Sequence, residues 1–394
     1  MNTSKNEIYI FIIWEKARIQ ENHILNDLSK KFSIMDVIEI TWSKIEFLNN
    51  LKRFYGKTLP DAKEKAELCG TGSFLLVVVS DPNPKFIEPS QSTISSKDDY
   101  VNINILNCKN QYRKLIGKNY TVHSSVSKNE TNHNLTLLFG KNLQDFEKSL
   151  PNEWDKKIKK TKCDLIGNDD WKDMNQLLYV LNGTVNYVIL RNFEEMPNEF
   201  DFHDVDLLVE DEKLVYIVKK DFLPKKDNPR SIEIKVGSEN ITLNPNYIGD
   251  HYYDEKWEHD ILKRRIFHPN GFYIPCNSDY FFTLLYHVIF HERWKKISSI
   301  RDDYKKILLN LANTLQYDDL DEMILNNKLS SKLYLEKYMK KSSYSRTDVF
   351  RYKMRHNESS RLVKTSFFIL QTHGFRTLIF AIKEKIKLIL KLRY

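Results

Sequence analysis

The chain has 394 residues, of which 41% are hydrophobic and 12% aromatic, with only 11 glycines and 11 prolines. This composition excludes an intrinsically disordered or fibrous protein and predicts two or three globular domains with substantial cores. The formal net charge is +8, and because most of it lies near the carboxyl end, the rest of the chain does not require an acidic partner.

The four cysteines are scattered without a Cys-x-x-Cys pair, which indicates free thiols in a reducing compartment. The first apolar run, residues 8–14, is too short to cross a membrane. It is followed at once by Glu15 and Lys16 and lacks the cleavage pattern of a signal peptide. We therefore interpret this run as a strand and expect a cytoplasmic protein.

Residues 1–150 alternate between strand-like and helix-like segments, a pattern typical of an α/β domain. The predicted strands are 8–14, 33–42 and 73–81, and the predicted helices are 15–32, 44–55, 104–116 and 130–139. The charged stretch 150–162 contains Pro151 and predicts a linker to a second domain.

A second α/β domain with a helical extension is predicted over residues 163–340. Its predicted elements are a helix over 170–182, strands over 185–190, 204–210 and 213–218, and a hairpin of 231–236 with 239–243 around Gly237. From about residue 255 the pattern becomes mostly helical, including 278–291. The expected architecture is thus α/β, with an N-terminal domain, a second domain and a basic tail.

The tail, residues 341–394, holds 13 Lys and Arg residues against three acids, so its net charge is +10 and that of the remaining chain is −2. From Thr365 its apolar residues recur every three or four positions, which predicts an amphipathic helix. Gln371 and Arg376 interrupt the apolar pattern, so a transmembrane span is not predicted. The pattern favours an anionic membrane surface over an ordinary packed helix, and scarce aromatic residues make nucleic acid the weakest alternative.

Asp204 and Asp206 begin a strand-like segment that continues into the apolar run 207–209. Side chains two residues apart on a strand share a face, so the two carboxylates are expected side by side. Like charges repel unless a cation neutralises them, and hard oxygen ligands favour Mg²⁺. Arg191 and Asn192, which end the preceding strand, are candidates for binding phosphate groups. These residues indicate a phosphoryl-transfer site, and a solvated pair of turn residues is the simpler alternative.

The segments Tyr-Val-Ile-Leu-Arg-Asn (187–192) and Asp-Val-Asp-Leu-Leu-Val (204–209) resemble the nucleotidyltransferase fold. They are similar to nucleotidyltransferase-like proteins encoded in bacterial capsule and surface-polysaccharide gene clusters. Residues 249–262, 280–287 and stretches of the N-terminal half also look similar to that set, so the resemblance covers most of residues 8–310. The turn of the family is usually Gly-Ser or Gly-Gly, and Arg191-Asn192 departs from it.

The resemblance implies a third carboxylate on a neighbouring strand. The matching strand is 241–246, which carries Asn244 where an acid is expected. An amide binds Mg²⁺ more weakly than a carboxylate and does not act as a base. We therefore expect either that Glu233 or Asp250 substitutes, or that the site is impaired.

Two histidine-containing segments have competing interpretations. His287 and His291 are four residues apart on a predicted helix and could share a Zn²⁺ ion, but buried, hydrogen-bonded histidines are the simpler reading. In a third reading, His287 faces the phosphate site. The sequence His123-Ser124-Ser125 is interpreted as a helix entry with Asn129 as N-cap, while a substrate-binding role stays open. Weaker candidates for phosphate or acceptor contacts are Lys52, Arg53, Tyr55 and Arg113.

The combined expectation is a Mg²⁺-dependent transferase of bacterial surface-polysaccharide synthesis, a context implied by the resemblance. It would move a nucleotidyl or phospho-polyol group from a nucleotide-activated donor to a glycan or lipid-linked acceptor at the inner face of the membrane. The alternative is a catalytically degenerate binding or scaffold protein of the same pathway, favoured by Arg191-Asn192 and Asn244. An RNA-directed nucleotidyltransferase is a weaker third hypothesis.

Overall fold

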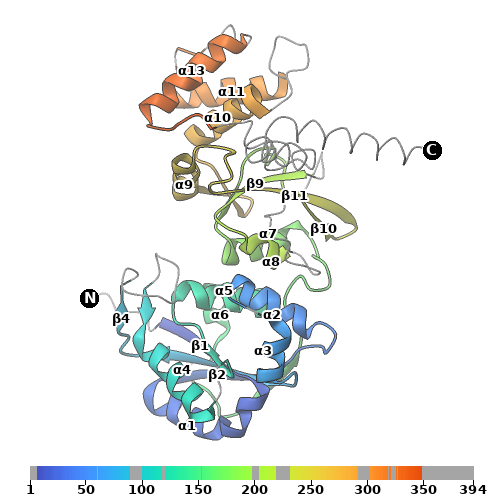
Figure 1. The fold of residues 1–394 in the computed structure, drawn as a ribbon, viewed down its shortest axis with the longest axis vertical. Helices are drawn as coiled ribbons and strands as arrows, with labels where there is room; N and C mark the ends of the chain where they lie inside the picture. Colours follow the sequence, from blue (N-terminus) through green and yellow to red (C-terminus); the bar gives the residue numbers. More distant parts are fainter. Residues whose placement is uncertain are drawn as a thin grey trace, which may run out of the picture.

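A computed structural model of the protein describes residues 7–59, 61–88, 100–117, 120–151, 153–197, 204–218, 231–291, 302–317, 319–320, 325 and 327–347. Within these ranges the fold is mixed α/β, with one five-stranded sheet, one four-stranded sheet and two small two-stranded sheets. Figure 1 shows the two larger sheets one above the other, with the helices α10, α11 and α13 beyond the second.

The first sheet has the strand order β6-β1-β3-β2-β7. Its strands are β1 (Glu7–Ile13), β2 (Ser33–Thr41), β3 (Phe74–Asp81), β6 (Val122–Ser124) and β7 (Lys159–Lys162). Neighbouring strands are antiparallel except β2 and β7, which are parallel. Every residue of the central strand β3 is buried, which accounts for its unbroken apolar run. The three strands predicted in this half are confirmed.

Helices cover both faces of the first sheet (Figure 1). Ile10 and Ile12 of β1 lie in one apolar core with residues of α2, α3, α5 and α6, whereas Phe11 and Ile13 lie in a second core with residues of α1 and α4. The helices are α1 (Glu21–Lys31), α2 (Phe47–Tyr55), α3 (Ala62–Cys69), α4 (Ile103–Ile116), α5 (Lys128–Phe139) and α6 (Leu143–Ser149). Shorter elements are η1 (Glu15–Gln20), η2 (Gly56–Thr58), β4 (Phe86–Ile87) and β5 (Val101–Asn102).

The second sheet has the order β10-β11-β9-β8 and carries the Asp204/Asp206 pair. Its strands are β8 (Tyr187–Ile189), β9 (Asp204–Val209), β10 (Ile232–Val236) and β11 (Glu239–Tyr247). β11 runs parallel to β9, and the other two pairs are antiparallel. The remaining elements are α7 (Met174–Thr184), α8 (Lys213–Val218), α9 (Glu255–Arg264), β12 (Ile266–His268), β13 (Phe272–Ile274), α10 (Asn277–Tyr286), the π-helix η4 (His287–His291), α11 (Asp302–Leu315) and α13 (Lys328–Lys341).

Three sequence predictions are wrong in detail. Residues 213–218 form the helix α8 instead of a strand, because a short apolar run does not distinguish the two by periodicity. Part of the predicted linker, Lys159–Lys162, pairs with β2 as an edge strand whose mostly exposed lysines give no apolar signal. Ser127 caps α5 in place of Asn129, because the helix begins one residue before Asn129.

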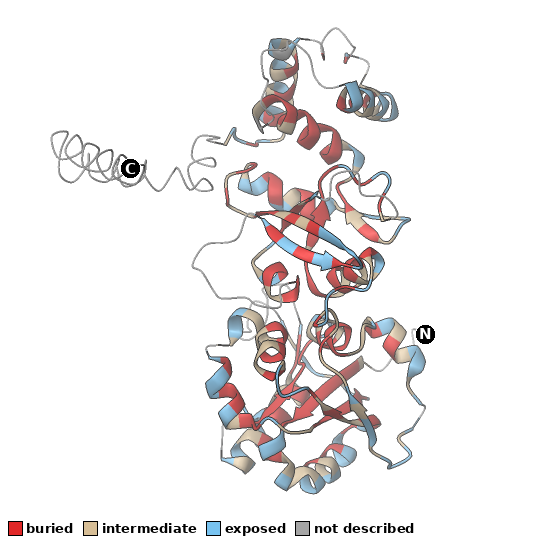
Figure 2. Cartoon of the chain, turned by 90° about the vertical axis from the view of Figure 1, so that its right-hand side faces the viewer, coloured by how far each residue is buried: buried red, intermediate tan, exposed pale blue. Residues whose placement is uncertain are grey.

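The two sheets share one apolar core. It extends from one face of the first sheet through residues of α2, α5 and α7 to β8, β9 and β11, and Figure 2 shows buried residues continuing between the two sheets. Helix α5 packs closely on α7 at Gly183, where a Cβ atom would collide with Thr136. The backbone oxygen of Gly183 also accepts a hydrogen bond from Asn132 at 3.0 Å. The two halves therefore pack directly on each other.

Arg53 of α2 provides a polar contact between the halves. Its guanidinium is buried and donates hydrogen bonds to Ile166 O at 2.6 Å and to Ile217 O, near the end of α8, at 2.8 Å. Burial lowers the pKa of Arg53 to about 10, and the side chain stays a cation at neutral pH. Arg53 is thus engaged by backbone carbonyls, so its sequence interpretation as a phosphate contact is wrong.

In the part of the chain that the structure describes, no helix is long and apolar enough to cross a membrane. The amphipathic helix predicted from Thr365 lies outside the described residues, which end at Thr347. Its expected contact with a membrane surface stays a prediction.

Candidate functional site

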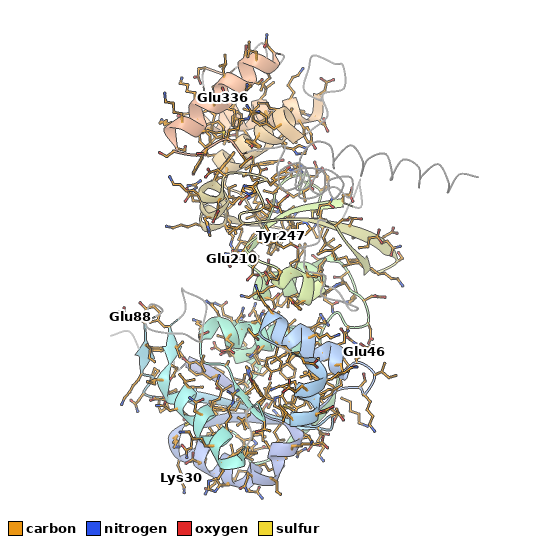
Figure 3. The ribbon with its side chains drawn as sticks, in the orientation of Figure 1. Lys30, Glu46, Glu88, Glu210, Tyr247 and Glu336 are labelled. Atoms are coloured by element: carbon orange, nitrogen blue, oxygen red, sulfur yellow. The ribbon has the colours of Figure 1, made fainter. Side chains whose placement is uncertain are left out.

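Asp204 and Asp206 lie on the same face of β9, as the strand period predicts. Asp204 is exposed and Asp206 is partly exposed, whereas Val205 and Leu207 between and after them are buried on the opposite face. Figure 3 labels Glu210, which directly follows β9, and Tyr247, the last residue of β11. The acid pair lies at the opposite, amino-terminal end of β9. The two carboxylates therefore lie at the start of β9, on the side opposite to Val205 and Leu207.

Arg191 forms an ion pair with Asp206. Nη2 of Arg191 lies 2.9 Å from Oδ2 of Asp206, and the arginine side chain is only 7% exposed. The position is fixed by the backbone, because the N–H of Leu190 donates to the carbonyl of Asp206 at 2.9 Å. Burial opposes the charge of Arg191, but Tyr252 and Asp206 favour it, so the pKa of Arg191 is raised. The site contains a held cation as well as two acids.

Asn192 forms the turn after Arg191. It is exposed and has a φ angle of 57°, in the left-handed region that asparagine tolerates better than most residues. Glycine and asparagine adopt positive φ more readily than other residues, which gives a physical reason for an asparagine at this position. The turn directs the chain away from β8 while Arg191 stays at the sheet.

The neighbouring strand places an amide beside the acid pair. In the parallel register of β11 and β9, Asn244 lies opposite Asp206 and Thr242 lies opposite Asp204. Glu233 of β10 pairs with Thr242, one strand further away. Two strand spacings amount to roughly 10 Å, so the backbone of Glu233 is well separated from that of Asp204. Asn244 therefore occupies the position where a third carboxylate was expected.

Asp250 holds a turn and does not join the acid pair. It is buried, and its two carboxylate oxygens accept hydrogen bonds from the backbone N–H groups of Tyr247 at 3.0 Å and Tyr252 at 2.7 Å. Carboxylates that bond successive backbone N–H groups in this way stabilise turns. The geometry assigns Asp250 to the support of the loop after β11.

Glu258 of α9 supports the same loop. It is fully buried and accepts hydrogen bonds from the N–H groups of Gly249 at 2.8 Å and Tyr253 at 3.0 Å. Burial, with a smaller contribution from the negative charge of Asp250, raises the pKa of Glu258 to about 8. Asp250 and Glu258 therefore both hold the loop that follows β11 through its backbone N–H groups, and Glu258 is neutral at pH 7.

The supported loop presents Tyr252 to His287. The Tyr252 hydroxyl lies 2.9 Å from Nδ1 of His287. His287 begins the π-helix η4, so the four-residue spacing to His291 does not have the α-helical geometry assumed from the sequence. His287 is hydrogen-bonded, as the simpler interpretation predicts, and the side chain of His291 lies outside the described residues.

The chemistry of the acid pair is compatible with Mg²⁺ only if a ligand and water complete the coordination. Within the described ranges, no three His, Cys, Asp or Glu side chains converge on a point that could hold a metal. Mg²⁺ is often bound through one or two carboxylates, several waters and the phosphates of a ligand. Asp204 and Asp206, with the amide of Asn244 alongside, match that donor set but not an all-protein cage.

Comparison with known proteins leaves the site to be interpreted from its own geometry. No family model, curated protein or solved structure matches this chain. The resemblance in the sequence motifs therefore stays a prediction. What the structure adds is the common face of Asp204 and Asp206, the ion pair with Arg191 and the register that sets Asn244 beside them.

Proposed function

We propose that the chain is a Mg²⁺-dependent transferase that acts on a nucleotide or nucleotide-activated donor at Asp204 and Asp206. One observation carries the proposal. A buried arginine is held 2.9 Å from Asp206, on a sheet face where Asp204 projects and has no ion-pair partner among the described residues. An acid pair with a fixed cation at its side suits a ligand that brings both phosphates and a metal ion.

The residues have separate roles in this proposal. Asp204 and Asp206 would hold Mg²⁺, which would neutralise charge on the phosphates of the donor. Arg191 would bind an oxygen of the group being transferred and stabilise the charge that develops there. Asn192, exposed in the left-handed turn, would donate to a phosphate oxygen. The surface-polysaccharide context, the glycan or lipid-linked acceptor and the location at the inner membrane face are proposed from the sequence resemblance and the basic tail.

Asn244 favours a second candidate function. A carboxylate at this position would complete a three-acid site, and an amide leaves the metal more weakly held. Arg191 also neutralises Asp206 when no ligand is present. In this second candidate the domain binds a nucleotide or a related ligand without transferring any group, and recruits other enzymes of the same pathway.

Calorimetric titration tests the proposed function. The full chain is titrated with nucleoside triphosphates and with CDP-activated polyols, with and without Mg²⁺, and the experiment is repeated on the Asp204→Asn/Asp206→Asn variant. We expect one donor to bind only with Mg²⁺ and the variant to bind it at least tenfold more weakly, about 1.4 kcal/mol. A matched control, Glu210→Gln/Glu239→Gln, removes two exposed acids from the same sheet and should not change the affinity.

The outcomes separate the two candidates. Mg²⁺-dependent binding followed by consumption of the donor in the presence of a glycan or lipid acceptor supports a transferase. The same binding without consumption of the donor supports the binding protein. If no nucleotide binds, or if the double variant binds as well as the wild type, the proposal for this site is wrong.

A further inference from the structure

A cavity lies in the N-terminal half, far along the chain from the acid pair. Its volume is about 260 Å³. It lies beside the edge strand β6, between the end of α2, the helix α3, the end of α4 and the start of α5. Its deeper lining includes Tyr55, Lys65, Arg113, Tyr120, His123 and Glu130. Tyr55, Arg113 and His123 were singled out separately in the sequence, and the fold brings them together.

Three cations gather at the inner end of the cavity. Lys65 donates to the carbonyl of Tyr120 at 2.6 Å, Arg113 Nε donates to that of Val122 at 2.8 Å, and Lys109 behind them donates to that of Ser124 at 3.2 Å. None of the three forms an ion pair with a carboxylate of the described residues. Lys65 and Lys109 are buried, which makes their charges costly. Nζ of Lys65 lies 4.8 Å from the ring centroid of Tyr55 and 5.2 Å from that of Tyr120, so cation–π contacts offset part of this cost.

One carboxylate lies close to these cations. Glu130 accepts a hydrogen bond from the backbone N–H of Val126 at 2.8 Å and lies 3.8 Å from the His123 ring. These three cations face one acid at the buried end of the cavity, while the exposed Asp61 and Glu64 add two carboxylates at its mouth. Burial lowers the pKa of Lys65 to about 8, and Arg113 is among the groups that oppose its charge. The positive charge therefore gathers at the buried end of the cavity, away from the two exposed carboxylates.

Two neutral polar side chains, Tyr55 and His123, also line the cavity. The hydroxyl of Tyr55 is buried and, like the nearby indole N–H of Trp14, has no hydrogen-bond partner among the described residues. His123 is buried, and burial together with Lys109 lowers its pKa well below its usual range, so the ring is neutral. Nε2 of His123 lies 3.1 Å from Nδ2 of Asn134, which donates to it, so the ring N–H is on Nδ1.

We propose that this cavity binds a phosphomonoester of a small polyhydroxy compound. The phosphate would lie at the inner end, where Lys65 and Arg113 supply charge and Tyr55 supplies a hydroxyl. A phosphomonoester carries about −1.5 to −2 charges at pH 7 and can interact with both cations that line the cavity, Lys65 and Arg113, whereas a carboxylate carries only one charge. The cavity is several times the roughly 30 Å³ that one water occupies in the liquid, so it has room for more than the phosphate.

The mouth of the cavity suits hydroxyl groups. Glu64 and Thr58, both exposed, line the outer part with Asp61, and carboxylates and hydroxyls accept and exchange hydrogen bonds with polyols. These acids are in contact with solvent, which screens their repulsion of the phosphate. The cavity thus has a cationic end for the phosphate and an acceptor-rich end for the organic part.

Calorimetry with small phosphates tests this proposal. The full chain is titrated with inorganic phosphate, glycerol 3-phosphate and glucose 6-phosphate, and with glycerol and glucose as uncharged counterparts. We expect one phosphomonoester to bind in a 1:1 complex more tightly than inorganic phosphate, and the uncharged compounds not to bind. Arg113→Gln should weaken binding at least tenfold, because a charged hydrogen bond is lost.

The variant Tyr55→Phe tests binding with a substitution that should not impair folding. It removes one hydroxyl that has no hydrogen-bond partner in the part of the chain that the structure describes, so the thermal midpoint should stay unchanged while the phosphomonoester binds about tenfold more weakly. Lys63→Gln, an exposed position of α3 outside the cavity, is the matched charge control and should bind as the wild type does. The proposal is overturned if no phosphomonoester binds, if inorganic phosphate binds as tightly as the esters, or if Tyr55→Phe and Arg113→Gln leave the affinity unchanged.

Discussion

Replacing Arg53 by methionine is expected to lower the free energy of unfolding by about 3–5 kcal/mol. The guanidinium makes two short hydrogen bonds, to Ile166 O at 2.6 Å and Ile217 O at 2.8 Å, and both acceptors lie in the other half of the chain. Charged hydrogen bonds contribute roughly 1.5–3 kcal/mol each, and their loss leaves buried carbonyls without a donor. Methionine keeps most of the apolar stem, so the change reports the polar contact. The measurement is urea-induced unfolding followed by far-ultraviolet circular dichroism.

The neighbouring residue supplies the control for this prediction. Lys52 lies on the same helix and is half-buried, and Lys52→Met removes one positive charge in the same way. Its expected effect is within about 0.5 kcal/mol. Equal losses in the two variants would contradict the role assigned to Arg53 and attribute the effect to helix α2 or to net charge.

The stability of the protein is expected to fall by roughly 3–5 kcal/mol between pH 4.5 and pH 8 through Glu258 alone. The pKa of Glu258 is raised from 4.5 to about 8, first by burial and then by Asp250. In this pH range the unfolded chain loses the proton and the folded protein keeps it. Because the folded state binds more protons, the free energy of unfolding decreases as the pH rises. Above about pH 8 both states are ionised and this contribution becomes constant.

Glu258→Gln separates this effect from the other titrations. The glutamine does not ionise, so the stability of the variant should lack the fall that the wild type shows over this range. At pH 4.5 the variant is expected to be about 1–3 kcal/mol less stable than the wild type, since the amide NH₂ cannot accept the hydrogen bond from Gly249 or Tyr253. This difference should shrink and then reverse as the wild type loses stability toward pH 8. Glu255→Gln, an exposed position of the same helix, should keep the fall. Identical pH profiles for Glu258→Gln and the wild type would contradict the prediction.

The strands with strong apolar patterns could be predicted because burial on both faces produces an unbroken apolar run. β3 shows this most clearly, and the alternation of β9 predicted the common face of Asp204 and Asp206. β7 could not be predicted, because an edge strand with mostly exposed lysines has the composition of a linker. Residues 213–218 were ambiguous, since four buried apolar positions out of six suit either a strand or a helix.

In the candidate site, features that depend on a single strand could be predicted, and most features that depend on contacts between distant segments could not. The register that sets Asn244 beside Asp206 was anticipated by matching strands. The ion pair of Arg191 was not, because it depends on the pairing of residue 190 with Asp206 across the sheet. Asp250 was considered as a metal ligand on its residue type, but its backbone hydrogen bonds become visible only when the turn after β11 is formed.

The N-terminal cavity required the order of the first sheet. Tyr55, Arg113 and His123 come from separate parts of the sequence, and no local pattern links them. They meet because β6 pairs with β1 at the edge of the sheet, which brings the segment around residue 120 next to α2 and α3. Charge alone gave no signal either, since buried and exposed lysines look alike in a sequence.

The apolar core shared by the two sheets limits how the chain can be divided. A cut between residues 150 and 163 would fall between α6 and α7 and would uncover the surface on which α5 packs against α7 at Gly183. A contiguous apolar surface of this kind promotes self-association. Each half produced alone is therefore expected to be poorly soluble, and co-production of the two halves should rescue both as a nicked but intact complex.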